Sequence, residues 1–77
     1  MRKVVVYHAA GCHLCERALE VVHAVRLEHP FELELIDIGG DADLEARYRE
    51  RIPVVEIDGE PAFTFFVVPE ALAARMR

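Results

Sequence analysis

The stretch of sequence that decides the fold is VVVYHAAGCHLC, residues 4–15. It opens with an uninterrupted apolar run rich in β-branched residues, the pattern of a strand buried on both faces of a parallel sheet. Gly11 interrupts this run, and from Cys12 onward apolar residues recur with the period of an α-helix. The sequence therefore predicts a strand, a turn and a helix that begins at a cysteine.

Local signals along the rest of the chain predict the order β-α-β-α-β-β-α. Pro30 ends the first helix, and Asp58-Gly59 is the pattern of a tight hairpin. The apolar face of the second strand switches near Leu35, so this strand either ends buried or contains a bulge there. The predicted helices cover residues 12–29, 41–49 and 69–75, and the predicted strands cover residues 4–7, 31–38, 54–57 and 62–68.

Length and composition indicate one domain over residues 1–77, because a chain below about 80 residues builds a single core. The composition is 53% hydrophobic with few Gly and Pro, which excludes a disordered or low-complexity segment. A formal net charge of −5 disfavours nucleic-acid binding. The apolar run after Lys3 is too short for a signal peptide or a membrane span. We expect a cytoplasmic monomer that binds neither nucleic acid nor membrane.

Cys12 and Cys15 are the only cysteines and form a C-x-x-C motif. Cys12 stands at the start of the first predicted helix, where free N–H groups and the helix dipole stabilise a thiolate. Cys15 lies one turn later, within reach of Cys12 but more buried. Thiol–disulfide exchange requires an exposed thiolate that attacks and a second thiol that resolves the mixed disulfide. We therefore assign Cys12 as the nucleophile and Cys15 as the resolving cysteine.

The two neighbours of Cys12 in the sequence, Gly11 and His13, are candidates for tuning the thiol. A protonated His13 would add positive charge beside Cys12 and favour its thiolate. As an exposed residue of the first helical turn, it would have no role. The sequence leaves both interpretations open.

A metal carrier is the alternative function for the same cysteine pair. Cys12, Cys15, His13 and His8 offer the soft ligands that Zn and Cu(I) prefer. A structural zinc site uses four ligands, commonly from two separated pairs, and the chain has no second C-x-x-C. We therefore assign no metal ligands. A third interpretation is a module of the same fold that only binds partners.

Ile52 and Pro53 precede the third predicted strand and form a second group of candidates. Pro53 either marks a strand edge or bulge, or follows a cis peptide bond. In the second case, the free backbone N–H and C=O of Ile52 bind an extended substrate. The C-x-x-C motif favours the cis interpretation.

Arg47, Arg49 and Arg51 lie just before this Pro, and Arg47 and Arg51 share a helix face. They either pair with Glu45 and Glu50 or grip a carboxylate of the substrate. The sequence leaves these two interpretations equally open.

With these features the chain resembles the thioredoxin-fold superfamily, and most of all the small glutaredoxin-like proteins. The segment GCHLC at residues 11–15, followed by Glu16, is typical of a bacterial glutaredoxin-like group. The resemblance covers essentially the whole chain. It implies a four-stranded mixed sheet flanked by three helices, with the first two strands parallel and the last two in a hairpin. It also implies a dithiol active site with cis-Pro53 facing Cys12.

The resemblance implies a thiol–disulfide oxidoreductase that requires no cofactor. Its substrate would be a disulfide-containing protein or a small thiol compound, and its reductant glutathione or a thioredoxin-reductase-type system. Glutathione is thus one candidate co-substrate. The chain departs from thioredoxins at Val6, where they carry a buried carboxylate, and at Gly11, where they carry Trp. It also departs from glutaredoxins at residues 67–70. Glutaredoxins carry there a Gly-Gly-acid turn that binds glutathione, whereas this chain has Val-Val-Pro-Glu.

Overall fold

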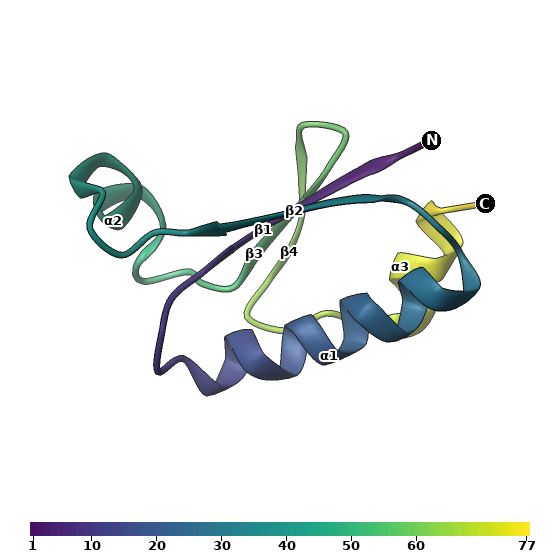
Figure 1. The fold of residues 1–77 in the computed structure, drawn as a ribbon, viewed down its shortest axis with the longest axis horizontal. Helices are drawn as coiled ribbons and strands as arrows, with labels where there is room; N and C mark the ends of the chain where they lie inside the picture. The colour runs from purple at the N-terminus through teal and green to yellow at the C-terminus, as the bar shows by residue number, and fades with distance from the viewer.

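The four strands form one mixed sheet with the spatial order β2-β1-β3-β4 (Figure 1). In the computed structural model, which describes residues 1–77, β1 is parallel to β2 and antiparallel to β3, and β3 and β4 form an antiparallel hairpin. The predicted element order and the sheet with three flanking helices are confirmed. The strands are β1 (Lys3–His8), β2 (Glu32–Asp37), β3 (Val54–Ile57) and β4 (Glu60–Thr64), and the helices are α1 (His13–Glu28), α2 (Ala42–Tyr48) and α3 (Pro69–Arg75).

Strand β1 alternates in burial, so the prediction of a strand buried on both faces is correct only in part. Val4 and Val6 are fully buried and belong to the main core cluster, whereas Val5 and Tyr7 are half-buried. The covered face packs against α1 and α3, which lie side by side along one face of the sheet (Figure 1). The other face of β1 is covered only in part, because α2 is short and lies beyond the end of β2 (Figure 1).

Strand β2 is a regular edge strand without the bulge near Leu35. The predicted burial is reached at Ile38, one residue beyond the end of the strand. Its register with β1 is continuous from Glu32 to Asp37, without a bulge. None of its residues is buried, and the first buried side chain is that of Ile38, just after the strand. As an edge strand it has only one neighbour, which explains why its apolar residues stay partly accessible.

The hairpin of β3 and β4 turns at Asp58-Gly59 as predicted, and both residues adopt a positive φ, +52° and +84°. This is the combination that a type I′ turn requires. A register shift in the hairpin lies between Val55 and Glu56. The predicted fourth strand is too long, because β4 ends at Thr64 and Phe65 takes a left-handed φ of +65° that breaks the strand.

A second, smaller buried cluster lies at the end of the molecule where α1 begins and α2 lies (Figure 1). It consists of Ala9, Cys15, Ile38, Tyr48, Ile52 and Val54. The chain termini lie together at the opposite end in this view. None of the helices combines the length and the apolar character needed to cross a membrane.

Candidate functional site

Cys12 is the N-cap residue of α1, as the sequence predicts. Its backbone is extended, with φ −94° and ψ 105°, and its Sγ accepts a hydrogen bond from the backbone N–H of Cys15 at 3.1 Å. Gly11 makes this entry into the helix possible, because it has a φ of +76° that side-chain-bearing residues rarely adopt. A free helix N–H aimed at sulfur stabilises negative charge on that atom.

Cys12 and Cys15 are joined as a disulfide, with their Cα atoms 5.2 Å apart. The two sulfurs differ in access. Cys15 is only 2% exposed and belongs to the small buried cluster, whereas Cys12 is half-buried and packs against that cluster from outside. The predicted asymmetry between an accessible and a covered cysteine is therefore present.

The Ile52–Pro53 peptide bond is cis, which confirms the interpretation favoured from the sequence. The ring of Pro53 is fully buried, and the side chain of Ile52 lies in the same buried cluster as Cys15. The carbonyl oxygen of Pro53 accepts a 2.9 Å hydrogen bond from the N–H of Phe65. Ile52 itself takes part in none of the turn and loop backbone hydrogen bonds and lies outside the strands, so its peptide groups lack such partners.

Arg47 and Arg51 are brought together, but not on one helix face and not in ion pairs with Glu45 and Glu50. The helix ends at Tyr48, so Arg51 lies beyond it and turns back to donate two hydrogen bonds to the carbonyl oxygen of Arg47, at 2.6 and 3.2 Å. Glu45 is instead paired with Arg49, at 2.6 and 2.8 Å. The predicted pairing of this arginine group is therefore confirmed only for Arg49 with Glu45. Glu50 forms no ion pair, and neither do the guanidinium groups of Arg47 and Arg51.

Tyr48 connects this arginine pair to the rest of the site, a role that the sequence did not reveal. The guanidinium carbons of Arg47 and Arg51 both lie 5.6 Å from the centre of its ring. The ring also stacks on that of Tyr7, and Tyr48 shares the buried cluster with Cys15 and Ile52. The only sequence signal was an aromatic residue between two arginines on a helix with few other apolar residues.

His13 points into solvent, with a side chain that is 92% exposed and an Nδ1 atom 3.6 Å from a carboxylate oxygen of Glu16. It contacts no buried part of the site. Nowhere does the chain assemble three or more His, Cys, Asp or Glu side chains into a group that could hold a metal ion. The two sulfurs therefore have no third ligand from His8 or His13.

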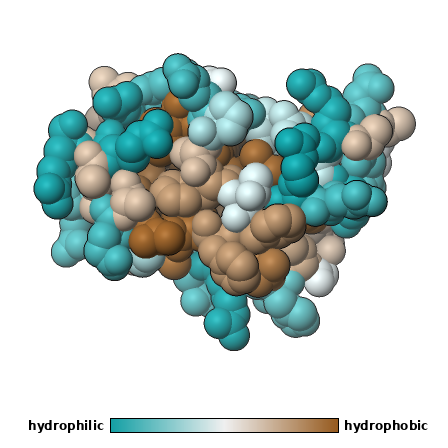
Figure 2. Space-filling view, turned by 180° about the vertical axis from the view of Figure 1, so that it is seen from behind, coloured by the Kyte–Doolittle hydropathy of each residue, from teal (hydrophilic) through white to brown (hydrophobic).

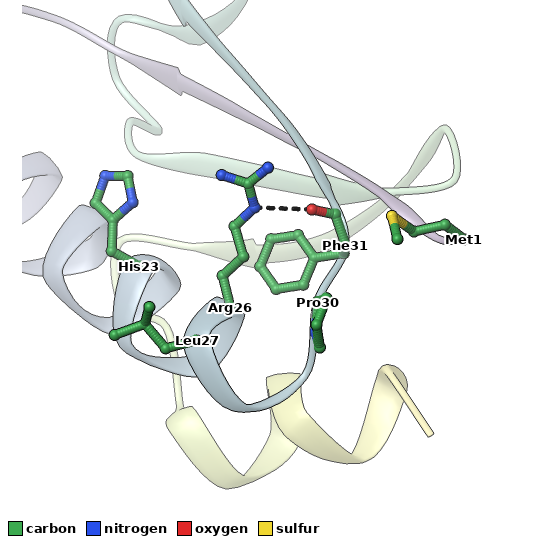
Figure 3. Close-up of a pocket in the computed structure, with 6 residues that line it drawn as sticks. All are labelled: Met1, His23, Arg26, Leu27, Pro30 and Phe31. Atoms are coloured by element: carbon green, nitrogen blue, oxygen red, sulfur yellow. Dashed lines mark hydrogen bonds between the residues drawn. The ribbon is translucent and has the colours of Figure 1, made fainter.

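The larger pocket of the molecule, about 440 Å³, has neither cysteine in its lining. Figure 3 shows its lining residues. The pocket is formed by Met1, by the second half of α1 and by Pro30 and Phe31, which precede β2. Arg26 Nε donates a 2.8 Å hydrogen bond to the carbonyl oxygen of Phe31 there. His23 on its rim is about 16 Å along the helix from Cys12, at 1.5 Å per residue. None of the predicted site residues lines this pocket.

Comparisons with known proteins agree with this arrangement. Protein Ne2328 from Nitrosomonas europaea is 32% identical, with a TM-score of 0.81 over 99% of this chain and 92% of that one. The crystal structure of protein XcR50 from X. campestris is 26% identical, with a TM-score of 0.78 over 94% of this chain and 92% of that one.

More distant structures share the fold. A mutant thioredoxin from Halobacterium salinarum is 20% identical, with a TM-score of 0.70 over 97% of this chain and 71% of that one. This likeness shows the thioredoxin-like α/β fold. No curated protein matches the sequence significantly.

Residues 3–77 match the family model described as "Glutaredoxin-like domain (DUF836)". The family match, the thioredoxin-fold neighbours and the close Cys12–Cys15 pair together support a redox role. The chain therefore belongs to the glutaredoxin-like domain family and has a thioredoxin-like fold.

Proposed function

We propose that this protein is a thiol–disulfide oxidoreductase with Cys12 as nucleophile and Cys15 as resolving cysteine. The observation that carries the proposal is the 3.1 Å hydrogen bond from the N–H of Cys15 to Sγ of Cys12 at the first turn of α1. After reduction the same N–H and the helix dipole favour a thiolate on Cys12 at neutral pH. Cys15 is covered, so it reacts with a sulfur already bound to Cys12 rather than with free disulfides.

The reaction then runs in two displacements. The Cys12 thiolate attacks one sulfur of the substrate disulfide, the substrate S–S bond breaks, and the departing thiolate takes up a proton. Cys15 next loses its proton and attacks Sγ of Cys12, which releases the second substrate thiol and forms the Cys12–Cys15 disulfide. The substrate gains two electrons and two protons. Both electrons come from the cysteine pair, one proton comes from Cys15, and solvent supplies the other because Cys12 reacts as a thiolate.

Ile52 and Pro53 are proposed to position the substrate. The peptide groups of Ile52 make no hydrogen bond in the loops of the chain, and its side chain lies in the cluster of Cys15. An extended substrate can pair with them as an added strand does. The guanidinium groups of Arg47 and Arg51 lie over the Tyr48 ring and form no ion pair, and they are proposed to bind a carboxylate of the substrate.

Gly11 and His13 complete the proposed site. Gly11 sets the turn that places Cys12 at the helix start, and a protonated His13 adds positive charge next to it.

No cofactor takes part, and two electrons from glutathione or from a thioredoxin-reductase-type system return the pair to the dithiol. We propose that the protein acts as a cytoplasmic monomer.

Cysteine variants test this mechanism. We expect Cys12→Ser to abolish reduction of a disulfide substrate, because no sulfur remains to attack. Cys15→Ser should still attack but stop at the mixed disulfide, which mass spectrometry detects as an adduct on Cys12. Full turnover by Cys12→Ser would contradict the proposal, and so would an absence of any adduct on Cys15→Ser.

A further inference from the structure

A small apolar groove lies beside the redox site, between α1 and the segment that follows β4. It encloses about 70 Å³. That is more than the roughly 30 Å³ of one water molecule and less than the roughly 150 Å³ cavity that holds benzene. The groove therefore has the size of a branched aliphatic group. Its lining residues are Leu14, Arg17, Ala18, Val21, Phe65, Phe66 and Val67.

Two residues make the groove continuous with the site. Leu14 stands between Cys12 and Cys15 in the first turn of α1 and forms part of the groove wall. On the other wall, Phe65 donates its backbone N–H to the carbonyl oxygen of Pro53 at 2.9 Å. A chain bound at Ile52 and Pro53 with its sulfur at Cys12 therefore has the groove next to it.

The two phenylalanines are held outside the core by their backbone. Phe65 has a φ of +65°, a conformation uncommon for a residue that carries a side chain and frequent at functional sites. Its N–H is bound to Pro53, and the N–H of Phe66 is bound to the carbonyl oxygen of Thr64 at 2.7 Å. The side chains of Phe65 and Phe66 remain 40% and 68% exposed.

Adjacent exposed aromatic residues indicate a binding site, whereas single exposed apolar residues scattered over a surface are normal. Figure 2 shows that apolar surface gathers in the middle of one face of the molecule and that polar side chains surround it. The exposed apolar residues that follow β4 in the sequence are Phe65, Phe66 and Val68.

We propose that this groove binds an apolar side chain that neighbours the reacting cysteine of a protein disulfide. The proposal rests on the proposed function and names its substrate class. The occupant is an extended protein segment with an aliphatic residue beside the cysteine, because the groove has the volume for such a group and an almost wholly apolar lining. Arg17 is the one charged lining residue, so an acidic group next to that aliphatic residue fits the charge. Glutathione has no aliphatic side chain and leaves the groove empty.

Two mixed disulfides with glutathione, formed by peptides that differ only in a Leu or a Ser after the Cys, test this specificity. We expect the reduced protein to act on the Leu peptide with a kcat/KM about tenfold higher, which is typical of an apolar pocket. Phe66→Ser and Phe65→Asn should bring this ratio close to one; Asn is chosen because it tolerates a positive φ. Leu27→Ser is the matched control, since Leu27 is 87% exposed and lies outside this groove, and it should leave the ratio unchanged.

Binding measurements separate this proposal from the proposed function. The same peptides with Cys replaced by Ser are titrated into the oxidised protein and followed by NMR. Tighter binding of the Leu peptide to the wild type, lost in Phe66→Ser, would support the groove. If the protein reduced no disulfide but still showed this difference in binding, only the proposed function would be overturned. Equal kcat/KM and equal binding for the two peptides would overturn the groove. The groove proposal would also be overturned if the wild type formed a dimer that Phe66→Ser dissociates. The exposed Phe65, Phe66 and Val68 would then contact a second copy of the chain.

Discussion

The rings of Tyr7 and Tyr48 stack with their centres 4.1 Å apart and their planes at 16°. Tyr7 belongs to β1, in the middle of the sheet, and Tyr48 is the last residue of α2. Because α2 has no other buried residue, this contact is the main attachment of the helix to the sheet. Through Tyr48, the stack also fixes the position of two guanidinium groups beside the redox site.

The first prediction concerns the ionisation of Tyr7. Burial, reinforced by the Tyr48 hydroxyl, raises the pKa of Tyr7 from 10.0 to about 12. The chain has two Tyr and no Trp, so the ultraviolet absorbance of phenolate reports on this pair alone. In the folded protein, we expect part of the phenolate absorbance to appear only as the pH approaches 12, and we expect Tyr7→Phe to lack that part. An absorbance change of the folded wild type that has its whole midpoint near pH 10, with no part displaced toward pH 12, would contradict the prediction.

The second prediction concerns the stability that Tyr48 provides. Tyr48→Ala removes a buried aromatic ring from the smaller cluster and should lower the free energy of unfolding by roughly 3 kcal/mol. Tyr48→Phe keeps the stack and should cost less than about 1 kcal/mol. Urea denaturation of the two variants measures the difference. Equal stability of Tyr48→Ala and the wild type would show that α2 does not depend on the stack.

The third prediction separates the arginines before Pro53. Arg47 and Arg51 have no carboxylate partner, whereas Arg49 is paired with Glu45. We therefore expect Arg47→Ala with Arg51→Ala to raise KM about tenfold for a disulfide substrate that carries a carboxylate, since one charge-assisted hydrogen bond contributes roughly 1.5–3 kcal/mol. For the same substrate as an amide, KM should not change.

Arg49→Ala is the matched control, because it removes one positive charge from the same segment without touching the free pair. It should leave the preference for the carboxylate substrate intact. An equal loss of preference in the control would show that net charge, rather than the position of Arg47 and Arg51, governs recognition.

The elements whose ends depend on local chemistry were predicted well from the sequence. Helix α1 begins at a cysteine cap and ends before Pro30, and β3 lies between Pro53 and the Asp58-Gly59 turn. In each case the residue that stops the element acts through its own backbone. The cysteine pair could be found because it is a short motif with few chemical meanings. The cis-proline could be found only together with this pair, because a Pro before a strand also fits a sheet edge or a bulge.

The errors came from contacts between distant segments. The residues from Ala62 to Val68 are mostly apolar, so nothing in their pattern ends β4. The strand ends where Phe65 takes a φ of +65° while its N–H binds the carbonyl oxygen of Pro53. Likewise, Tyr48 at the end of α2 stacks on Tyr7 of β1, and no pattern within residues 41–49 indicates this contact. Periodicity in one segment carries no information about such partners.

The last prediction concerns the hairpin turn at low pH. The backbone N–H of Lys3, at 3.0 Å, and the guanidinium of Arg2, at 2.8 Å, both donate to the carboxylate of Asp58. These two contacts hold the pKa of Asp58 below its ordinary value of 3.8. A carboxyl group whose pKa is lower in the folded state stabilises the fold above its unfolded pKa, and this contribution is lost as the pH falls through the folded pKa.

Asp58→Asn tests this linkage, because Asn tolerates the φ of +52° but carries no charge. We expect the wild type to be more stable than the variant near neutral pH and this gap to close as the pH falls below 3.8. Urea denaturation across this range measures the gap. Glu60→Gln removes a charge from the same hairpin without breaking an ion pair, and it should produce no comparable change with pH. A gap for Asp58→Asn that persists at low pH would mean that shape, rather than ionisation, gives Asp58 its effect.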